Sequence, residues 1–337
     1  MMKDGKMRKI KIAQIGTSRY SHGSVIFDTV KGLPEIFEIV GYAMPEGEKE
    51  KFPERMTSFE GYRELTVEEI LSDASIEAAI IETEEIYLTK YARLAARAGK
   101  HIHMEKPGGL SEKEFEALIK EVKCGGKIFH TGYMYRYNPV ISEAIRRVRE
   151  GELGEIVGVE AQMNCWHGEA VTRWLSELDG GMMFYLGCHM IDLVLLLQGE
   201  PERIIPFNRS SGRFAGCDSR DVGFAVLEYK NGASFVKVSA SEHGGFTRRQ
   251  LVITGTKGRI AICPLEVSVK YPLQYTEYNE CASEDWGDTG TVYRSEEHDR
   301  YALMMSSFAE MVRGERENPY TPDYELALFK TIKKCCE

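Results

Sequence analysis

The sequence predicts a doubly wound α/β domain with a parallel sheet at the N-terminus, followed by a C-terminal α+β domain built on an open-faced, mainly antiparallel sheet. Over about the first 130 residues, short apolar runs alternate with helical stretches, which is typical of a parallel sheet covered on both faces. Strand-like segments then follow one another with few helices between them. The 337 residues exceed what one hydrophobic core usually supports. We therefore expect two domains, 1–133 and 134–337, and leave open whether the last helices pack on the first domain.

The elements of the first domain are marked by strand runs and by helix start signals. Continuous apolar, β-rich runs predict parallel strands that are buried on both faces. Thr66 and Ser111 each begin a capping box, in which an N-cap hydroxyl and an acid three residues later bond the first turn of a helix. The predicted strands are 9–16, 37–43, 76–81, 101–104 and 127–133, and the predicted helices are 24–31, 66–73, 88–98 and one that opens at Ser111. A further helix, 139–150, is predicted just after this domain.

The second domain is predicted to consist mainly of strands joined by tight turns. Asn231-Gly232 lies between two alternating segments and is the strongest hairpin signal of the chain, and Thr256-Lys257-Gly258 predicts a second tight turn. Helices return near the end of the chain, where we expect the adjacent Cys335 and Cys336 to be tail residues. The predicted strands are 155–163, 203–210, 222–229, 233–241, 250–254, 259–263 and 267–271, and the predicted final helices are 299–313 and 324–335.

Composition and charge exclude several classes of protein. A content of 43% hydrophobic and 28% charged residues is ordinary for a folded domain. The net charge of -9 provides no basic surface for a phosphate backbone, so we do not expect nucleic acid as a partner. The longest apolar run, 182–197, is interrupted by polar residues, which argues against a membrane-spanning segment.

The N-terminal residues and the cysteines both indicate the compartment of the protein. The N-terminal residues pass directly into the first predicted strand, without the apolar segment of a secretory signal, so we expect a cytoplasmic protein. The eight cysteines form no CxxC pair and have no histidine partners at zinc-finger spacing. We therefore expect reduced thiols, no disulfide framework and no metal site.

A candidate phosphate-binding turn follows the first predicted strand. Such a turn usually reads GxGxxG, because its backbone must approach a pyrophosphate group closely. Here residues 16–23 read GTSRYSHG, so only the first glycine fits and serines occupy the other two glycine positions. A serine hydroxyl can donate to a phosphate oxygen, although an ordinary βα turn is an equal alternative. The candidate cofactor contacts in this turn are Gly16, Thr17, Ser18, Ser21 and His22.

The end of the second predicted strand normally carries an acid that binds the ribose hydroxyls of NAD and repels the 2′-phosphate of NADP. Met44 stands at that position, and Glu46 can replace the acid if the chain bends at Pro45. No arginine follows immediately. The choice between NAD and NADP therefore stays open, with a slight preference for NAD.

The segment His103-Met-Glu-Lys-Pro107 places Lys106 after a predicted strand, at the edge of a parallel sheet where ligands bind. Further motifs follow in order: Tyr135-Arg-Tyr-Asn-Pro139, Gly154-Glu-Ile, Trp174, Gly180-Gly181 and Gly187-Cys-His-Met-Ile-Asp192. Together these motifs resemble the glucose-fructose oxidoreductase/inositol dehydrogenase (Gfo/Idh/MocA) family. The resemblance is collinear over almost the whole chain.

This resemblance implies a Rossmann domain joined to an open-faced sheet domain, with NAD or NADP as cofactor and a sugar, polyol or related carbonyl compound as substrate. Lys106 matches the active-site lysine of the family, whose ammonium holds and polarises the reacting oxygen. His189 matches the general acid/base, a task that suits an imidazole because its ordinary pKa lies near neutrality. Glu105 and Thr83 match positions beside the cofactor.

The apolar segment 180–199 carries three polar side chains, Tyr185, His189 and Asp192. Helical spacing puts them at i, i+4 and i+7, within one stripe of a helix. A buried polar stripe is costly unless it is hydrogen-bonded or lines a wet cavity, so we expect these residues to line the substrate site. The alternative is a core histidine that is bonded to a backbone carbonyl.

Two positions depart from the family pattern. Tyr185 stands where many members have an aspartate that orients the histidine, and a phenol supplies no negative charge near neutral pH. Either Asp192 or Glu169 takes over that role, or Tyr185 contacts substrate, or dehydrogenase activity has weakened. In the segment 82–88, Thr83 is kept, but Glu84 brings a carboxylate near the expected nicotinamide side, with a solvated loop as the alternative.

Further candidate substrate contacts are Arg136, Trp166 and His167, with a purely structural turn as the alternative for Arg136. An open sheet with apolar residues such as Phe224, Val236 and Val238 needs a cover, so we expect a homodimer or homotetramer through this face. The leading hypothesis is a nicotinamide-dependent oxidoreductase. The alternatives are a non-catalytic regulatory protein that binds the cofactor, and a redox-neutral lyase or glycosidase that uses NAD transiently.

Overall fold

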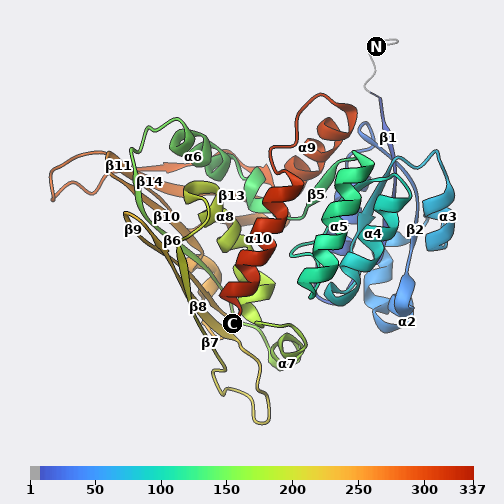
Figure 1. The fold of residues 1–337 in the computed structure, drawn as a ribbon, viewed down its shortest axis with the longest axis horizontal. Helices are drawn as coiled ribbons and strands as arrows, with labels where there is room; N and C mark the ends of the chain where they lie inside the picture. Colours follow the sequence, from blue (N-terminus) through green and yellow to red (C-terminus); the bar gives the residue numbers. More distant parts are fainter. Residues whose placement is uncertain (1–7) are drawn as a thin grey trace. The chain divides into compact units, whose positions relative to one another are not determined.

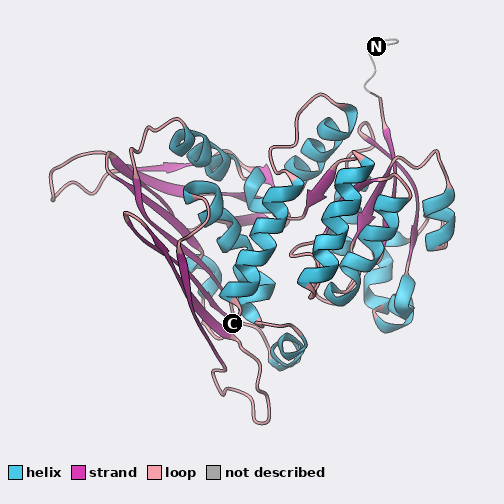
Figure 2. Cartoon of the chain, in the orientation of Figure 1, coloured by secondary structure: helices cyan, strands magenta, loops and turns pink. Residues whose placement is uncertain are grey.

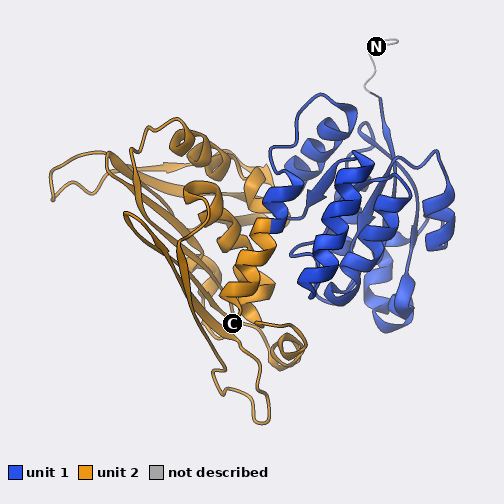
Figure 3. Ribbon diagram, in the orientation of Figure 1, with its two compact units in different colours: residues 1–133, 301–326 blue, residues 134–300, 327–337 orange. Residues whose placement is uncertain are grey.

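The computed structural model describes residues 8–337 and contains two compact units (Figure 3). Unit 1 runs to Tyr133 and also includes Tyr301–Leu326, and unit 2 comprises Met134–Arg300 and Ala327–Glu337. The last two helices are therefore divided between the units: α9 belongs to unit 1, whereas α10 begins in unit 1 and ends in unit 2.

Unit 1 is a doubly wound α/β domain around a five-stranded sheet with the order β2-β1-β3-β4-β5 (Figure 1). All its strand pairs are parallel, which confirms the predicted fold class. The order changes direction between β1 and β3, and sheets of this kind bind ligands at the carboxyl ends of the strands beside that point. The elements are β1 (Ile10–Ile15), β2 (Phe37–Ala43), β3 (Ala78–Ile81), β4 (His101–Met104), β5 (Phe129–Thr131), α1 (Gly23–Lys31), α2 (Glu48–Lys51), α3 (Val67–Ser72), α4 (Leu88–Arg97), α5 (Glu112–Gly125) and α9 (Ala302–Arg313).

The two helix start signals predicted in unit 1 both cap a helix. The Thr66 hydroxyl accepts a hydrogen bond from the Glu69 backbone N–H at 3.1 Å, and the Glu69 carboxylate accepts one from the Thr66 N–H at 2.7 Å. This reciprocal pair is a complete capping box for α3, worth about 1 kcal/mol for the hydroxyl alone. Ser111 caps α5 through its hydroxyl, which accepts from the Glu114 N–H at 3.3 Å, one of the two bonds of the predicted capping box.

The connection after β2 contains three short helical segments that the sequence did not predict. It contains a short turn at Pro45–Gly47, the four-residue helix α2, and a helical stretch at Pro53–Phe59. Glu46 and Gly47 both adopt left-handed backbone angles, with φ of 59° and 71°. This sharp reversal turns the following residue, Glu48, back toward the end of the sheet.

Unit 2 is built on an eight-stranded sheet with the order β15-β14-β11-β10-β6-β9-β8-β7, and strands dominate it in Figure 2. The β6–β9 pair is parallel and the other pairs are antiparallel, so the predicted mainly antiparallel sheet is confirmed. The strands of this sheet are β6 (Ile156–Asn164), β7 (Arg203–Arg209), β8 (Val222–Tyr229), β9 (Gly232–Ser239), β10 (Gln250–Gly255), β11 (Gly258–Ile262), β14 (Glu277–Cys281) and β15 (Thr291–Arg294).

A smaller sheet and the helices complete unit 2. The small sheet has the order β12-β13-β16, and α8 packs against β6 and β9. Strands β13 to β16 were absent from the prediction, because these short segments are rich in polar residues and lack an apolar alternation. The remaining elements are β12 (Val267–Lys270), β13 (Leu273–Tyr275), β16 (His298–Asp299), α6 (Pro139–Arg149), α7 (Glu169–Trp174), α8 (Cys188–Gln198) and α10 (Pro322–Cys335).

The two predicted turns join antiparallel strands. Tyr229 pairs with Gly232 at the end of the β8–β9 hairpin, and Gly255 pairs with Gly258 at the end of the β10–β11 hairpin. The signals at Asn231-Gly232 and at 256–258 are thereby confirmed as hairpins.

Of the three residues expected on the open face of the large sheet, Phe224 lies there and the two valines do not. Val236 and Val238 are fully buried, because successive residues of a strand point to opposite faces and these two point to the core. Phe207, Phe224 and Phe235 lie on the other face, where Phe207 is 49% exposed. Their ring centroids are 6.4 Å apart for Phe207 and Phe224 and 5.3 Å apart for Phe224 and Phe235. These three rings form the phenylalanine stripe of unit 2.

The C-terminal cysteines are anchored and are not a loose tail. Both are buried, the Asn208 side-chain amide donates to the Cys335 carbonyl at 2.8 Å, and the Arg220 guanidinium donates to the Cys336 carbonyl at 2.7 Å. A Cβ at Gly180 would lie 2.3 Å from the Cys336 sulfur, so only glycine fits there. The end of the chain therefore packs against the segment that leads into α8.

No helix between residues 8 and 337 combines the length and the apolar character needed to cross a membrane. The expectation that the chain lacks a secretory signal falls partly on residues 1–7, which lie outside the described residues.

Candidate functional site

The turn after β1 has the backbone of a phosphate-binding loop. Gly16 has a φ of +87°, and a Cβ there would lie 2.6 Å from atoms of Thr83. Ser18 also has a positive φ, 56°. The Gln14 side-chain amide donates to the carbonyls of Gly16 and Gly23, both at 2.9 Å, and so holds the two ends of the loop together.

Glu48 is a residue of this site that the sequence did not reveal. Its carboxylate accepts hydrogen bonds from the Thr17 backbone N–H at 2.8 Å and from the Glu84 backbone N–H at 3.0 Å. The residue is 0% exposed. Burial raises the pKa of Glu48 to about 7, although the N–H groups of Thr17, Glu84 and Ser18 oppose the rise. The only sequence signal for Glu48 is an acid shortly after the second strand, a signal that Glu46 shares.

Glu46 faces α4. Its carboxylate accepts hydrogen bonds from the Lys90 ammonium at 2.5 Å and from the Tyr91 hydroxyl at 2.7 Å. These two bonds hold the pKa of Glu46 below its ordinary value. The acid predicted to bind ribose thus already has two partners in unit 1.

The loop residues fit the phosphates of a dinucleotide. Within residues 8–337, the buried hydroxyl oxygens of Thr17 and Ser18 have no hydrogen-bond partner, which is uncommon for buried polar atoms. The Thr17 backbone N–H of the same loop donates to a carboxylate, so its direction suits an anion. However, the Glu48 carboxylate already accepts from the Thr17 N–H, a donor that such a loop offers to a phosphate.

Lys106 lies directly after β4 in a buried, charged environment. It is 1% exposed, and its ammonium lies 3.5 Å from the Glu105 carboxylate. His22 lies on the same carboxylate, with Nδ1 3.6 Å from Oε1. Burial alone would raise the pKa of Glu105, but the charges of Lys106 and His22 outweigh it and hold this pKa below its ordinary value. The loop after β1 and the end of β4 therefore meet at Glu105.

The end of β3 adds further carboxylates to this region. Glu82 is buried, accepts from the Ser21 hydroxyl at 3.4 Å, and lies 3.8 Å from Nε2 of His103. Burial and the charge of Glu105 raise the pKa of Glu82 well above its ordinary value. Thr83, also buried, packs its methyl group under Gly16.

The loop alternative proposed for Glu84 is wrong, because this side chain is mostly buried. Its carboxylate lies 3.7 Å from the Arg19 guanidinium, and only 13% of the side chain is exposed. Glu85, the next residue, is buried as well, and burial raises its pKa to about 7. Unit 1 thus surrounds Lys106 with carboxylates at the carboxyl ends of β3 and β4.

In unit 2, the segment with Tyr185 and His189 is not one continuous α-helix. Met183–Gly187 forms a π-helical turn, and α8 begins only at Cys188. A π turn contains an extra residue, so the angular positions before and after it no longer follow the α-helical period. The expected single stripe of Tyr185, His189 and Asp192 is therefore corrected.

Each of the three polar side chains has its own neighbours in unit 2. The Tyr185 ring lies 5.0 Å from the Trp174 ring, edge to face, and 6.2 Å from the ring of His167. The His189 ring makes an edge contact with Tyr135 at 5.5 Å. Tyr185, which stands where we expected an aspartate, thus packs against aromatic rings.

Asp192 is engaged by Arg136. The Arg136 guanidinium donates from Nε to one carboxylate oxygen at 2.9 Å and from Nη2 to the other at 2.8 Å. Both side chains are buried. Asp192, which we considered as the acid that orients His189, thus binds Arg136 with both of its oxygens. Arg136, a candidate substrate contact, uses two of its N–H groups in this bidentate pair.

A second buried charge cluster adjoins Tyr135. The Glu266 carboxylate accepts hydrogen bonds on one oxygen from the Tyr135 hydroxyl at 2.7 Å and from Arg249 at 2.9 Å, and its other oxygen forms an ion pair with Nε of Arg300 at 2.8 Å. Burial and the Glu266 charge raise the pKa of Tyr135, which keeps its hydroxyl protonated. No sequence motif marked Glu266, since its partners come from distant segments.

The remaining substrate candidates lie at the end of β6. Trp166 is 45% exposed, stacks on His243 with 3.9 Å between centroids, and has the Arg213 guanidinium 4.1 Å from its ring. Burial, followed by the charges of Arg249 and Arg213, lowers the pKa of His167 to about 4, so His167 is neutral at physiological pH.

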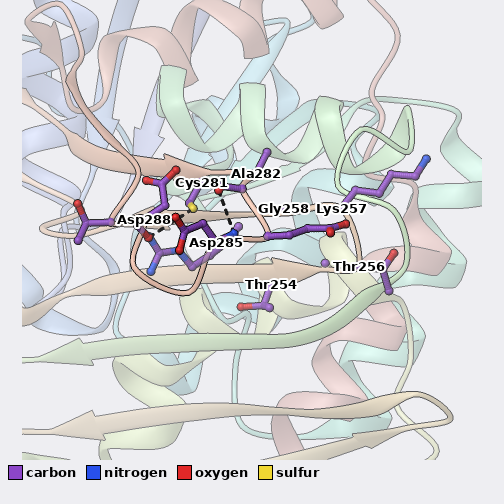
Figure 4. A pocket seen from close by; sticks show the side chains of 13 residues that line it. Thr254, Thr256, Lys257, Gly258, Cys281, Ala282, Asp285 and Asp288 are labelled. Carbon is purple, nitrogen blue, oxygen red and sulfur yellow. Dashed lines mark hydrogen bonds between the residues drawn. The ribbon is translucent and has the colours of Figure 1, made fainter.

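A large pocket of unit 2 contains none of the predicted site residues. Its volume is about 620 Å³, and it lies between the β10–β11 turn and the connection that follows β14 (Figure 4). Its lining carries both signs of charge, Lys257 and Arg259 as well as Asp285 and Asp288.

A doubly wound sheet with a phosphate-binding loop, joined to a unit with an open antiparallel sheet, defines a nicotinamide-dependent oxidoreductase. Residues 10–133 match the model of an oxidoreductase family with an NAD-binding Rossmann fold, and residues 141–261 match the GFO/IDH/MocA C-terminal domain. The chain belongs to the GFO/IDH/MocA oxidoreductase family, a family of NAD(P)-dependent dehydrogenases, as the sequence motifs indicated.

Known relatives support this class. The chain is 28% identical over 235 residues to D-xylose 1-dehydrogenase (NADP(+)) 2 of Haloferax volcanii, covering 68% of this chain and 70% of that protein. It is also 28% identical over 268 residues to scyllo-inositol 2-dehydrogenase (NAD(+)) of Bacillus subtilis, covering 74% of each. A solved oxidoreductase from Thermotoga maritima has the same fold, with a TM-score of 0.78 at 19% identity, covering 98% of this chain and 96% of that one.

Proposed function

We propose that the protein transfers a hydride between a nicotinamide cofactor and a sugar, polyol or related carbonyl compound. The observation that carries this proposal is the buried Lys106 ammonium beside Glu105, at the carboxyl end of β4 and within a cofactor-binding family. The relatives named for xylose and scyllo-inositol support the substrate class. When bound, the nicotinamide ring accepts or returns the hydride.

Lys106 is the group that orients the reacting oxygen. An ammonium held in a buried position is a strong hydrogen-bond donor to an alcohol or carbonyl oxygen, because little water competes with it. Glu105 fixes the lysine and balances its charge at 3.5 Å. Thr83, His22 and the residues of the loop after β1 are the proposed cofactor contacts, and Gly16 lets the loop approach the phosphates.

His189 is the proposed general acid/base. As hydride leaves the carbon of an alcohol, its hydroxyl proton must also leave, and an imidazole can take that proton and return it in the reverse reaction. Tyr135 packs its ring edge to face with His189 and is itself held by Glu266, which restricts the imidazole. Tyr185, Trp166 and His167 are the proposed substrate contacts.

The cofactor is proposed to be NAD in preference to NADP. Glu46 follows β2, where a carboxylate repels the 2′-phosphate of NADP. Calorimetric titration with each nucleotide tests this preference. Tighter binding of NADP than of NAD would contradict it.

Replacing Lys106 with alanine is expected to lower kcat by about a hundredfold or more, because the donor to the reacting oxygen is lost. The measurement begins with NAD⁺ or NADP⁺ and a panel of sugars and inositols, following absorbance of the reduced nicotinamide. Lys113→Ala, an exposed lysine at the start of α5, is the matched control and should keep wild-type turnover. Undiminished turnover in Lys106→Ala would remove this mechanism, and product formation without net reduced cofactor would indicate a redox-neutral reaction.

We also propose that two copies of the chain associate through the phenylalanine stripe. Burying a phenylalanine side chain contributes about 1.5–3 kcal/mol, and three adjacent rings present a continuous apolar area. Phe224→Glu is therefore expected to convert the dimer or tetramer into monomers in analytical ultracentrifugation. Leu303→Glu, at another exposed apolar residue, is the control. A monomeric wild-type protein would contradict the proposal.

A further inference from the structure

We propose that Glu48 occupies the anion site of the loop after β1 and competes there with the phosphate groups of the dinucleotide, so that this side chain weakens cofactor binding. The inference rests on the proposed function, since it concerns the same cofactor. It assigns to Glu48 a role opposite to that of an acid that holds the ribose.

The contacts of Glu48 are those of a bound anion. One carboxylate oxygen accepts from the Thr17 N–H at 2.8 Å, and the other accepts from the Glu84 N–H at 3.0 Å. Backbone N–H groups that converge from a loop with positive φ angles form a general anion-binding site. Gly16 and Ser18 supply those angles, at +87° and 56°. One oxygen of the carboxylate therefore takes a main-chain donor of the loop after β1, the Thr17 N–H, and the other oxygen takes a donor of the loop after β3.

The sheet order shows where this carboxylate lies. β1 lies between β2 and β3, and Glu48 belongs to the connection after β2. Its oxygens reach the loop after β1 and the loop after β3. The side chain thus spans the end of β1. A ribose-binding acid stays on the β2 side and offers its oxygens to hydroxyl groups, whereas both oxygens of Glu48 are taken by N–H groups.

Burial makes the competition strong. Glu48 is 0% exposed, so bulk water does not screen its charge. The Arg19 guanidinium lies 3.7 Å from the Glu84 carboxylate, so this cation is already paired with an anion other than Glu48. A pyrophosphate and the Glu48 carboxylate therefore exclude each other, both through charge and through the shared donors.

The backbone allows Glu48 to withdraw. α2 has only four residues, and it starts from Gly47 in a left-handed conformation with a φ of 71°. A Cβ at Gly47 would meet only flexible atoms of Glu50 and Lys51, at 3.9 and 4.0 Å, so this position is not packed against the core. A small rotation at Gly47 moves the carboxylate off the loop without disturbing the sheet.

The test measures nucleotide binding by calorimetry, with no substrate present. Glu48→Gln removes the charge and keeps the shape, and it is expected to bind NAD⁺ about tenfold or more tightly than the wild type. Glu48→Ala, which also frees the Thr17 and Glu84 N–H groups, is expected to show the same sign. Circular dichroism of both variants verifies that they are folded.

Glu50→Gln is the matched control, because it removes one carboxylate from the same short helix at an exposed position. It should leave the affinity for NAD⁺ unchanged. Weaker or unchanged binding by a folded Glu48→Gln variant would overturn the inference and identify Glu48 as a ligand of the cofactor or as a bystander. If neither the wild type nor any variant bound NAD⁺ or NADP⁺, the proposed function itself would fail.

Discussion

Replacing Asp192 with alanine is expected to lower the free energy of unfolding of unit 2 by about 3–5 kcal/mol. The Arg136 side chain is 0% exposed and the Asp192 side chain 1% exposed, so the substitution leaves a guanidinium in the interior without its carboxylate. An uncompensated buried charge is among the most destabilising changes in a protein. Urea denaturation near neutral pH measures the loss, with hydrogen exchange of α8 to locate it.

The double variant Arg136→Met, Asp192→Leu distinguishes the contribution of the two charges to stability from the contribution of side-chain packing. It removes both ions and fills the space with apolar side chains, so it should regain most of the stability that Asp192→Ala loses. An Asp192→Ala protein within about 1 kcal/mol of the wild type would show that this pair does not stabilise unit 2. It would then return Asp192 to consideration as a partner of His189.

The elements that were predicted well are those with strong local signals. The segments 37–43 and 101–104 coincide with β2 and β4, because each is a short run with glycine or proline on both sides of it. The capping box at Thr66 is likewise a local hydrogen-bond pattern, and the structure contains both of its bonds. Such features depend on a few neighbouring residues and can be found without knowledge of the rest of the chain.

The site was only partly predictable, because its geometry depends on long-range contacts and on backbone irregularities. Arg136 and Asp192 are 56 residues apart in sequence, and no spacing rule pairs them. The π-helical turn at Met183–Gly187 moves Tyr185 out of the expected stripe, and an apolar run does not reveal such a turn. Glu48 reaches the loop after β1 only because Gly47 is left-handed.

The buried carboxyl group of Glu85 in unit 1 is expected to make the stability of the protein depend on pH. Glu85→Gln is expected to raise the free energy of unfolding by about 3 kcal/mol near pH 8 and to change it little near pH 4. Burial raises the pKa of Glu85 in the folded protein to about 7, above its unfolded value. The wild type therefore loses stability as the pH rises through about 7, where the buried carboxyl must ionise. The glutamine variant has no proton to lose, so the difference between the two proteins grows over this window in urea denaturation curves.

An opposite control comes from the capping box of α3. The bonds from Thr66 hold the pKa of Glu69 below its ordinary value, so the ionised Glu69 stabilises the folded state. Its contribution is present above the unfolded pKa and is lost as the pH falls, and Glu69→Gln should therefore destabilise the protein at neutral pH and not in acid. His103, whose pKa burial lowers to about 4, titrates in the wild type and in both variants and cancels in each difference. A Glu85→Gln effect that did not change between acid and about pH 8 would mean that Glu85 is already solvated or paired, and that the carboxylates around Lys106 impose no cost on folding.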